Sequence, residues 1–300
     1  MEWIWAALGS AIGFAVVTIL YKIILERHVP SAGTFIAVAA LLNMPGALVP
    51  LAFVAFPGYP LVVWALALGS GAAFGLSLTL MFSILRREDV SLVTAIFQTT
   101  PVFVAIIAVF ALSERLSGWH WVAIMVTVAG AVLISLRRTG VGGRPVLGAW
   151  FFFMLVSSAL SAAGLTLSKA ALDDGMSVWN LYAVRSGSTV AVMLALSVRG
   201  HTLSELRILA RNTNGIVLFA LTEGVLATGA MYLTTFALLG PVAVASTVMA
   251  SRPMFVFLFG ILLSLGLLKV LSEPLDRASL VQRGLAIGMI VAGISTITLL

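Results

Sequence analysis

Ten apolar runs, each long enough to cross a membrane, dominate this 300-residue sequence. A transmembrane helix needs about 20 consecutive apolar residues. Runs of that length, closed by a charge, a proline or a glycine, predict ten helices near residues 3–25, 31–56, 61–85, 90–112, 117–136, 146–171, 178–199, 215–239, 241–267 and 280–300. The runs lack the alternation over ~10 residues that is typical of membrane β-strands. The sequence therefore predicts an all-α integral membrane protein.

The composition supports this class and excludes several others. Charged residues make up 9% of the chain and apolar residues 61%, whereas a soluble domain has roughly 25% charged residues. The net charge of +6 comes from bases in short gaps between apolar runs, so we expect membrane lipid and a small-molecule substrate as partners, and no nucleic acid. The absence of cysteine and of a second histidine near any histidine predicts no metal site and no cofactor.

Several sequence features occur twice at similar spacing. They are a proline after a polar pair, a Ser-Glu pair and a late Ala-Gly pair: Pro101 and Pro253, Ser113-Glu114 and Ser272-Glu273, Ala129-Gly130 and Ala292-Gly293. The prolines are 152 positions apart, and Lys22 and Lys169 match less closely at 147. A longer interval after the second proline predicts an insertion near Lys269. The chain is thus predicted to contain two related repeats, 1–140 and 141–300.

Five helices per repeat have a geometric consequence. An odd number of crossings makes the second repeat start from the opposite face, so the two repeats are inverted relative to each other. Inverted repeats with a binding site at mid-membrane, at their interface, are a recurrent transporter architecture. We therefore expect a central cavity between the repeats.

The two copies resemble the repeat of the EamA-type transporters, which belong to the drug/metabolite transporter superfamily. The motifs that carry the resemblance are Pro101, Ser113-Glu114-Arg115-Leu116 and Ala129-Gly130-Ala131-Val132, with Pro253, Ser272-Glu273-Pro274-Leu275 and Ala292-Gly293-Ile294 in the second copy. The resemblance implies ten helices, with segments 1–4 and 6–9 around the cavity and segments 5 and 10 behind them. It also implies an exporter or exchanger of metabolites, often driven by protons.

The basic residues of the loops predict the orientation. Twelve of them follow segments 1, 3, 5, 7 and 9, whereas the opposite face has Arg115 alone; the twelve are Arg27, Arg86, Arg87, Arg137, Arg138, Arg144, Arg199, Arg207, Arg211, Lys269, Arg277 and Arg283. The positive-inside rule places these twelve in the cytoplasm. Both termini of this multi-pass protein of the bacterial inner membrane would then be periplasmic, although members of the family generally have them inside.

Three charges lie within apolar runs: Arg185, Glu223 and Arg252. Each costs roughly 2.5–3.5 kcal/mol at a helix centre, so each must face protein, water or another charge. At 1.5 Å per residue, Arg252 lies roughly 17 Å and Glu223 roughly 24 Å from the face that bears the termini, with Arg185 at roughly 10 Å. Helix tilt can remove most of the difference between the first two, so an Arg252–Glu223 pair is feasible.

Two interpretations of these charges stay open. In the first, Arg252 and Glu223 form an ion pair that only joins segments 8 and 9. In the second, Arg252 anchors an anionic substrate, because its planar fork donates two parallel hydrogen bonds to a carboxylate, and Glu223 binds a proton or an ammonium group. Further candidate substrate-binding residues are Arg185, Gln98, Thr100, Tyr232 and Asn43.

These observations favour a secondary active transporter of a small polar metabolite, such as an amino acid or an organic anion, with proton coupling as an option. The alternative is a flippase of the same fold for lipids or lipid-linked metabolites. An enzyme is not expected, and we expect a monomer, with a homodimer as the alternative. Two pairs of glycines four residues apart, Gly71 with Gly75 and Gly284 with Gly288, predict close helix packing.

Overall fold

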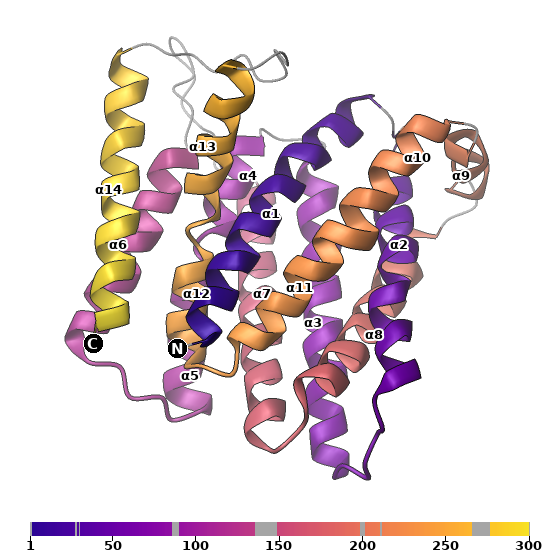
Figure 1. Ribbon diagram of the computed structural model, residues 1–300, viewed down its shortest axis with the longest axis horizontal. Helices are drawn as coiled ribbons and strands as arrows, with labels where there is room; N and C mark the ends of the chain where they lie inside the picture. The colour runs from indigo at the N-terminus through magenta and orange to yellow at the C-terminus, as the bar shows by residue number, and fades with distance from the viewer. Residues whose placement is uncertain are drawn as a thin grey trace.

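The computed structural model describes residues 2–27, 29, 31–85, 90–135, 149–198, 202–210, 212–265 and 277–299. Every regular element in these residues is a helix, and the helices form one bundle (Figure 1). They are α1 (Glu2–Arg27), α2 (Ala32–Phe53), α3 (Leu61–Leu85), α4 (Val90–Phe97), α5 (Thr100–Ala111), α6 (Gly118–Ser135), α7 (Ala149–Asp173), α8 (Val178–Ser197), α9 (Thr202–Ala210), α10 (Thr213–Phe219), the π-helical η1 (Ala220–Ala227), α11 (Thr228–Ala237), α12 (Val242–Met249), α13 (Arg252–Leu265) and α14 (Arg277–Leu299).

The predicted all-α membrane fold is confirmed. Each predicted range holds one helix or a succession of helices, and α9 lies in the linker after α8, where we expected a surface turn. Within the described residues, seven stretches are long and apolar enough to cross a membrane, and shorter apolar helices cover residues 100–111 and 118–133. The count of ten crossings stays a prediction. The insertion expected near Lys269 lies outside the described residues.

Two segments that we predicted as continuous are broken. α4 ends at Phe97 and α5 begins at Thr100, while α12 ends at Met249 and α13 begins at Arg252. Each break comes just before a proline, which has no N–H to donate to the preceding turn. At the first break a hydroxyl takes over part of this task, because Thr100 Oγ1 donates to Phe97 O at 2.6 Å. At the second break, Ser251 Oγ donates to Val248 O at 2.7 Å. The two helix ends, Phe97 and Met249, are 152 positions apart, and so are the two helix starts, Thr100 and Arg252. The two prolines have the same spacing.

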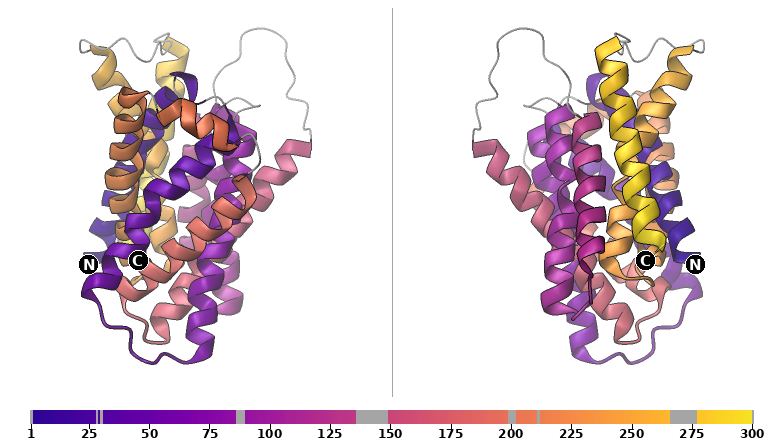
Figure 2. Two further views of the ribbon diagram at one scale, coloured as in Figure 1. Left: turned by 90° about the vertical axis from the view of Figure 1, so that its right-hand side faces the viewer. Right: turned by 90° about the vertical axis from the view of Figure 1, so that its left-hand side faces the viewer.

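A close contact joins α6 to α14, which lie side by side (Figure 2). A Cβ atom added to Gly130 would lie 2.8 Å from the carbonyl oxygen of Ala286, and one added to Gly293 would lie 2.8 Å from that of Ala123. Both glycines and both alanines are 163 positions apart. Gly130 of α6 therefore contacts α14 in the same way as Gly293 of α14 contacts α6. Two helices related by a two-fold axis make such reciprocal contacts. This contact explains the repeated Ala-Gly pair.

Two buried hydroxyl pairs are also related by sequence. Ser10 of α1 and Thr234 of α11 are hydrogen-bonded at 2.7 Å, and Ser157 of α7 and Ser77 of α3 at 3.1 Å. Ser10 and Ser157 are 147 positions apart, which is the interval between Lys22 and Lys169. The two pairs thus join matching helices of the two halves. We propose on this basis that residues 1–140 and 141–300 are inverted repeats.

The two predicted glycine pairs have different outcomes. A Cβ atom added to Gly71 would lie 2.2 Å from Arg185 O, and one added to Gly75 would lie 2.9 Å from Thr189 O, so these glycines bring α3 against α8 as expected. The second expectation is wrong within the described part of the chain. Around Gly284 and Gly288 no other residue lies within 4 Å of an added Cβ atom, because the packed face of α14 is the one that carries Gly293.

The repeated Ser-Glu pair has a structural role that we did not predict. Glu114 follows α5, and its carboxylate accepts hydrogen bonds from the backbone N–H groups of Val242 at 2.7 Å and Ala243 at 3.4 Å. These N–H groups begin α12, and the residue before them, Pro241, offers no side-chain acceptor. A carboxylate at a helix N-terminus is favourable because it meets the positive end of the helix dipole. The matching Glu273 lies outside the described residues.

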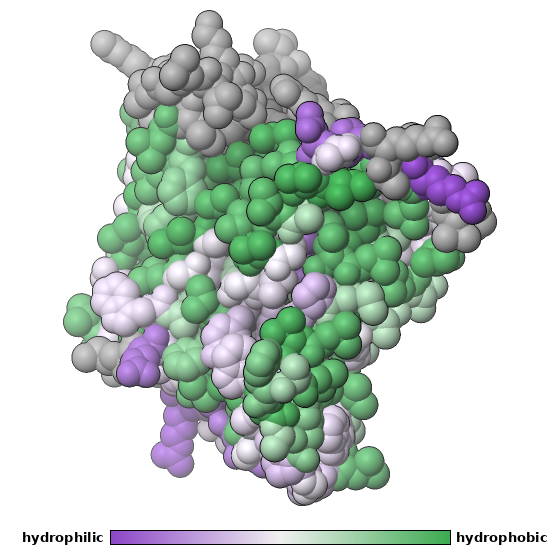
Figure 3. Space-filling model, turned by 45° about the vertical axis from the view of Figure 1, so that its right-hand side comes forward, coloured by the Kyte–Doolittle hydropathy of each residue, from purple (hydrophilic) through white to green (hydrophobic). Residues whose placement is uncertain are grey.

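The surface agrees with a protein that faces lipid. Apolar side chains cover the flank shown in Figure 3, and the hydrophilic side chains gather toward its two ends. Large exposed apolar residues on the helices include Phe53, Leu61 and Phe110. Both chain ends lie on the same face of the bundle (Figure 1). Most of the twelve basic residues lie among side chains outside the description, so the orientation stays a prediction.

Candidate functional site

A cavity of about 140 Å³ lies in the centre of the bundle. Its walls come from α1, α2, α3, α7, α8, η1, α11 and both broken segments. A cavity of this size has room for a small molecule. Of the seven predicted site residues, six line it: Asn43, Gln98, Thr100, Arg185, Glu223 and Arg252. That any of them binds substrate stays a prediction.

Arg252 is the first residue of α13, directly after the second break. Its guanidinium carbon lies 4.9 Å from the centre of the Phe14 ring on α1, a distance typical of a cation–π contact. The Nε atom of Arg252 is buried and has no hydrogen-bond partner. The break and the aromatic ring thus place a cation against the cavity, and none of the described acidic residues forms an ion pair with it.

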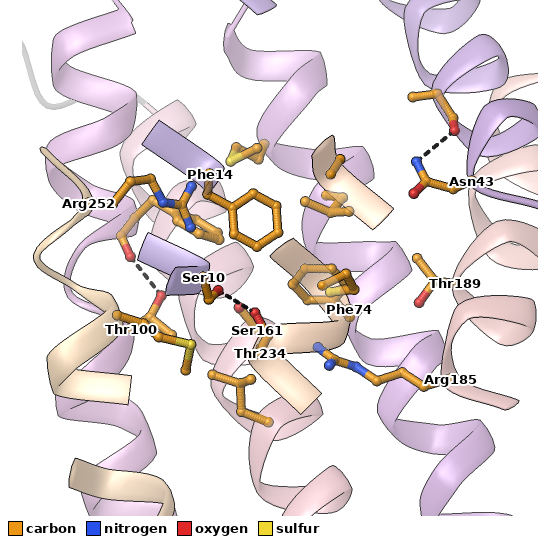
Figure 4. Close-up of a pocket in the computed structure, with 18 of the residues that line it drawn as sticks. Ser10, Phe14, Asn43, Phe74, Thr100, Ser161, Arg185, Thr189, Thr234 and Arg252 are labelled. Atoms are coloured by element: carbon orange, nitrogen blue, oxygen red, sulfur yellow. Dashed lines mark hydrogen bonds between the residues drawn. The ribbon is translucent and has the colours of Figure 1, made fainter. Parts of the chain in front are cut away.

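Arg185 lies on α8 with 1% of its surface exposed. All three guanidinium nitrogens are buried without a hydrogen-bond partner, and the guanidinium carbon lies 4.8 Å from the centre of the Phe74 ring. Figure 4 shows Arg185 and Arg252 reaching into the cavity from opposite sides, with Ser10 and Thr234 between them. We had placed Arg185 nearer the mouth, but it lines the same cavity as Arg252.

Glu223 is the one acidic residue among the described residues that line the cavity. It lies in η1 and is 2% exposed. π-Helical turns are rare and frequently occur at functional sites, and here the Thr228 hydroxyl bonds the carbonyl of Glu223, five residues earlier, at 2.9 Å. The carboxylate Oε2 accepts a hydrogen bond from Asn43 Nδ2 at 2.6 Å, while Oε1 has no partner. Tyr21 is close enough to interact electrostatically with both Glu223 and Arg252.

The feasible Arg252–Glu223 ion pair does not form in this structure. Among the described residues, Glu223 interacts with Asn43 and Tyr21, and Arg252 interacts with Phe14 and Tyr21. The depths predicted from the sequence assume a regular α-helix in segment 8 and one continuous α-helix in segment 9. A π-helical turn and a break change the direction in which these two side chains point, so similar depth does not bring them together.

The first break supplies the uncharged wall of the cavity. Gln98 is 5% exposed, and its Nε2 atom has no hydrogen-bond partner. Thr100 is 152 positions before Arg252 and begins α5 as Arg252 begins α13. The cavity therefore has an uncharged polar wall at the first break and a cationic wall at the second.

Tyr232 does not line this cavity. Its ring stacks on Trp179 with 4.3 Å between ring centres and meets Tyr182 edge-on at 5.7 Å. Its predicted role in substrate binding has no geometric support at the cavity. The residues that sequence reasoning missed are Phe14, Phe74 and Tyr21, which lie against the charged groups. Only Tyr21 carried a signal, as part of the Leu20-Tyr21-Lys22 repeat match.

No group of three or more histidine, aspartate or glutamate side chains that could hold a metal ion occurs among the described residues. Comparison with known families gives a match over residues 1–136 to the EamA-like transporter family. This match confirms the resemblance noted in the first repeat, and the long apolar helices are those of a multi-pass membrane protein.

Two further comparisons bear on the fold. No curated protein matches the sequence. A crystal structure of another protein superposes over 97% of this chain and 96% of that chain, with a TM-score of 0.67 and 18% sequence identity. Identity this low shows a shared fold and carries no information on substrate. The residues of the cavity are therefore the basis for a proposal on the cargo.

Proposed function

We propose that this EamA-like protein is a secondary active transporter of a small organic anion across the bacterial inner membrane. The observation that supports the proposal best is the state of Arg252, whose buried Nε lacks an acceptor at a helix break in the cavity wall. A buried donor without an acceptor is costly, and a carboxylate of the substrate would supply the missing acceptor for Nε. Export or exchange is the direction that the family suggests.

We further propose that Glu223 carries the coupling proton. It is buried, faces the cavity and keeps one carboxylate oxygen without a partner. Asn43 holds the other oxygen and so fixes the carboxyl group in one orientation. A carboxyl group that gains and loses a proton in such a place can link substrate movement to the proton gradient.

A thermal-shift screen tests the anion proposal. The purified protein is incubated with organic acids, amino acids and organic cations, because a ligand that binds the folded state raises its stability by mass action. We expect organic acids to stabilise the wild type and to have no effect on Arg252→Gln. Arg207→Gln is the matched control, since Arg207 is an exposed arginine on α9. Stabilisation by cations alone, or by acids equally in Arg252→Gln, would contradict the proposal.

A further inference from the structure

The cavity holds two arginines, and one anionic group can satisfy only one of them fully. We propose that the substrate is a short dicarboxylate, with one carboxylate bound by Arg252 and the other by Arg185. This inference rests on the proposed function and adds the substrate class. Arg185 comes from α8 and Arg252 from α13, and they reach into the cavity from opposite sides (Figure 4).

The unsatisfied polar atoms of the cavity wall are mostly donors. They are Nε, Nη1 and Nη2 of Arg185, Nε of Arg252 and Nε2 of Gln98, while Oε1 of Glu223 is the single acceptor among the described side chains that line the cavity. Buried polar groups in native proteins almost always have partners. A wall with five orphan donor atoms therefore fits a ligand rich in acceptors, and carboxylates offer acceptors alone.

Two aromatic rings fix how the arginines present their donors. Phe74 lies 4.8 Å from the guanidinium carbon of Arg185, and Phe14 lies 4.9 Å from that of Arg252. A cation–π contact uses the face of the aromatic ring and leaves the guanidinium donors without a hydrogen-bond acceptor, so they can bind a carboxylate through two parallel hydrogen bonds. Each arginine is therefore held ready for a carboxylate of its own.

Charge and space exclude the main competitor, a zwitterionic amino acid. Its single carboxylate would engage one arginine, and its ammonium group would need Glu223, so the second buried arginine would stay without an anion. A dicarboxylate neutralises both arginines, and with Glu223 protonated the loaded cavity carries no net charge from these groups. A cavity of about 140 Å³ favours a short chain between the carboxylates.

The test uses pairs of ligands that differ in one charge and hardly in shape. Malonate, succinate, glutarate and adipate are each compared with their own monoamide by isothermal titration of the full-length protein in detergent. We expect at least one diacid to bind the wild type roughly 10- to 100-fold more tightly than its monoamide, as the loss of one charge-assisted pair predicts. Arg185→Gln should remove this preference, and Arg207→Gln should keep it.

The outcomes separate this inference from the proposed function. If the monoamides bind as tightly as the diacids, or if Arg185→Gln keeps the preference, the dicarboxylate is wrong. The anion proposal then stands provided that Arg252→Gln still weakens the monoamides at least tenfold. If organic acids bind the wild type and Arg252→Gln equally, the proposed function fails as well. Arg185→Lys keeps the positive charge but loses the planar guanidinium group, and it controls for misfolding of Arg185→Gln. We expect this variant to be monodisperse by size exclusion and to show a reduced preference for the diacid.

Discussion

Asn43 on α2 donates a hydrogen bond of 2.6 Å to Oε2 of Glu223 in η1, which ties the carboxyl group of the cavity to a helix of the first half. Asn43 is itself fixed, since its Nδ2 also donates to the Ala39 carbonyl at 2.9 Å. The contact orients Glu223 without neutralising it. A substitution that keeps this hydrogen bond can therefore separate the effect of the charge of residue 223 from the effect of the position of its side chain.

Glu223→Gln is that substitution, because a glutamine oxygen can still accept from Asn43. If Glu223 carries the coupling proton, the variant should exchange substrate across proteoliposomes at a rate close to that of the wild type. Its accumulation of substrate driven by a pH gradient should fall by about an order of magnitude or more. Both rates are measured with the ligand that the thermal-shift screen identifies. Normal accumulation in this variant would remove Glu223 from the coupling mechanism.

Arg185→Gln should leave the ligand-free protein at least as stable as the wild type. Arg185 has no ion pair among the described residues, so its removal takes away a desolvated charge and one cation–π contact of about 0.5–2 kcal/mol. An arginine in a structural ion pair behaves differently, because its loss costs about 3–5 kcal/mol. Thermal unfolding followed by tryptophan fluorescence distinguishes the two cases. A fall in melting temperature of many degrees would assign Arg185 to stability and not to binding.

Gly293→Ala should destabilise the protein, whereas Gly288→Ala on the same helix should not. The added Cβ atom at Gly293 would lie 2.1 Å from Thr127 Oγ1 and 2.8 Å from Ala123 O, but at Gly288 it would meet no other residue within 4 Å. Overpacking of this kind costs about 1–3 kcal/mol, and α14 must move away from α6 to relieve it. Equal melting temperatures for the two variants would contradict the α6–α14 contact.

The orientation can be tested by fusing reporters after Leu300. The twelve basic residues on one face and Arg115 alone on the other predict that this face is cytoplasmic. A reporter enzyme that works only in the periplasm should then be active at the C-terminus, and a cytoplasmic one should be silent. The reverse pattern would show that this chain follows the orientation general in its family.

The sequence predicts the fold well because lipid imposes a simple rule on it. Only helices and closed barrels satisfy their backbone groups within the hydrocarbon layer, and long continuous apolar runs favour helices, so the ranges around α1, α3 and α7 can be predicted from composition. The sequence also identifies Arg185, Glu223 and Arg252, because a charge within an apolar run is costly in the membrane and is rarely present without a structural or functional role. Hydrophobicity does not report the partners of these charges. Those depend on a π-helical turn, two breaks and the rings of Phe14 and Phe74, which the composition of a run does not encode.

The equivalence of Thr100 and Arg252 has a consequence for how such a transporter changes its cargo. If the two halves descend from one duplicated unit, an ancestor with identical halves had the same residue at both positions. Its cavity could not distinguish the two orientations of a bound molecule. Divergence at this pair, together with that at other lining positions such as Gln98 and Ala250, would then have made the two ends of the cavity different, while the breaks and the α6–α14 contact stayed alike in the two halves. New selectivity can therefore evolve by exchanging a residue at either break, on a scaffold that does not have to be rebuilt.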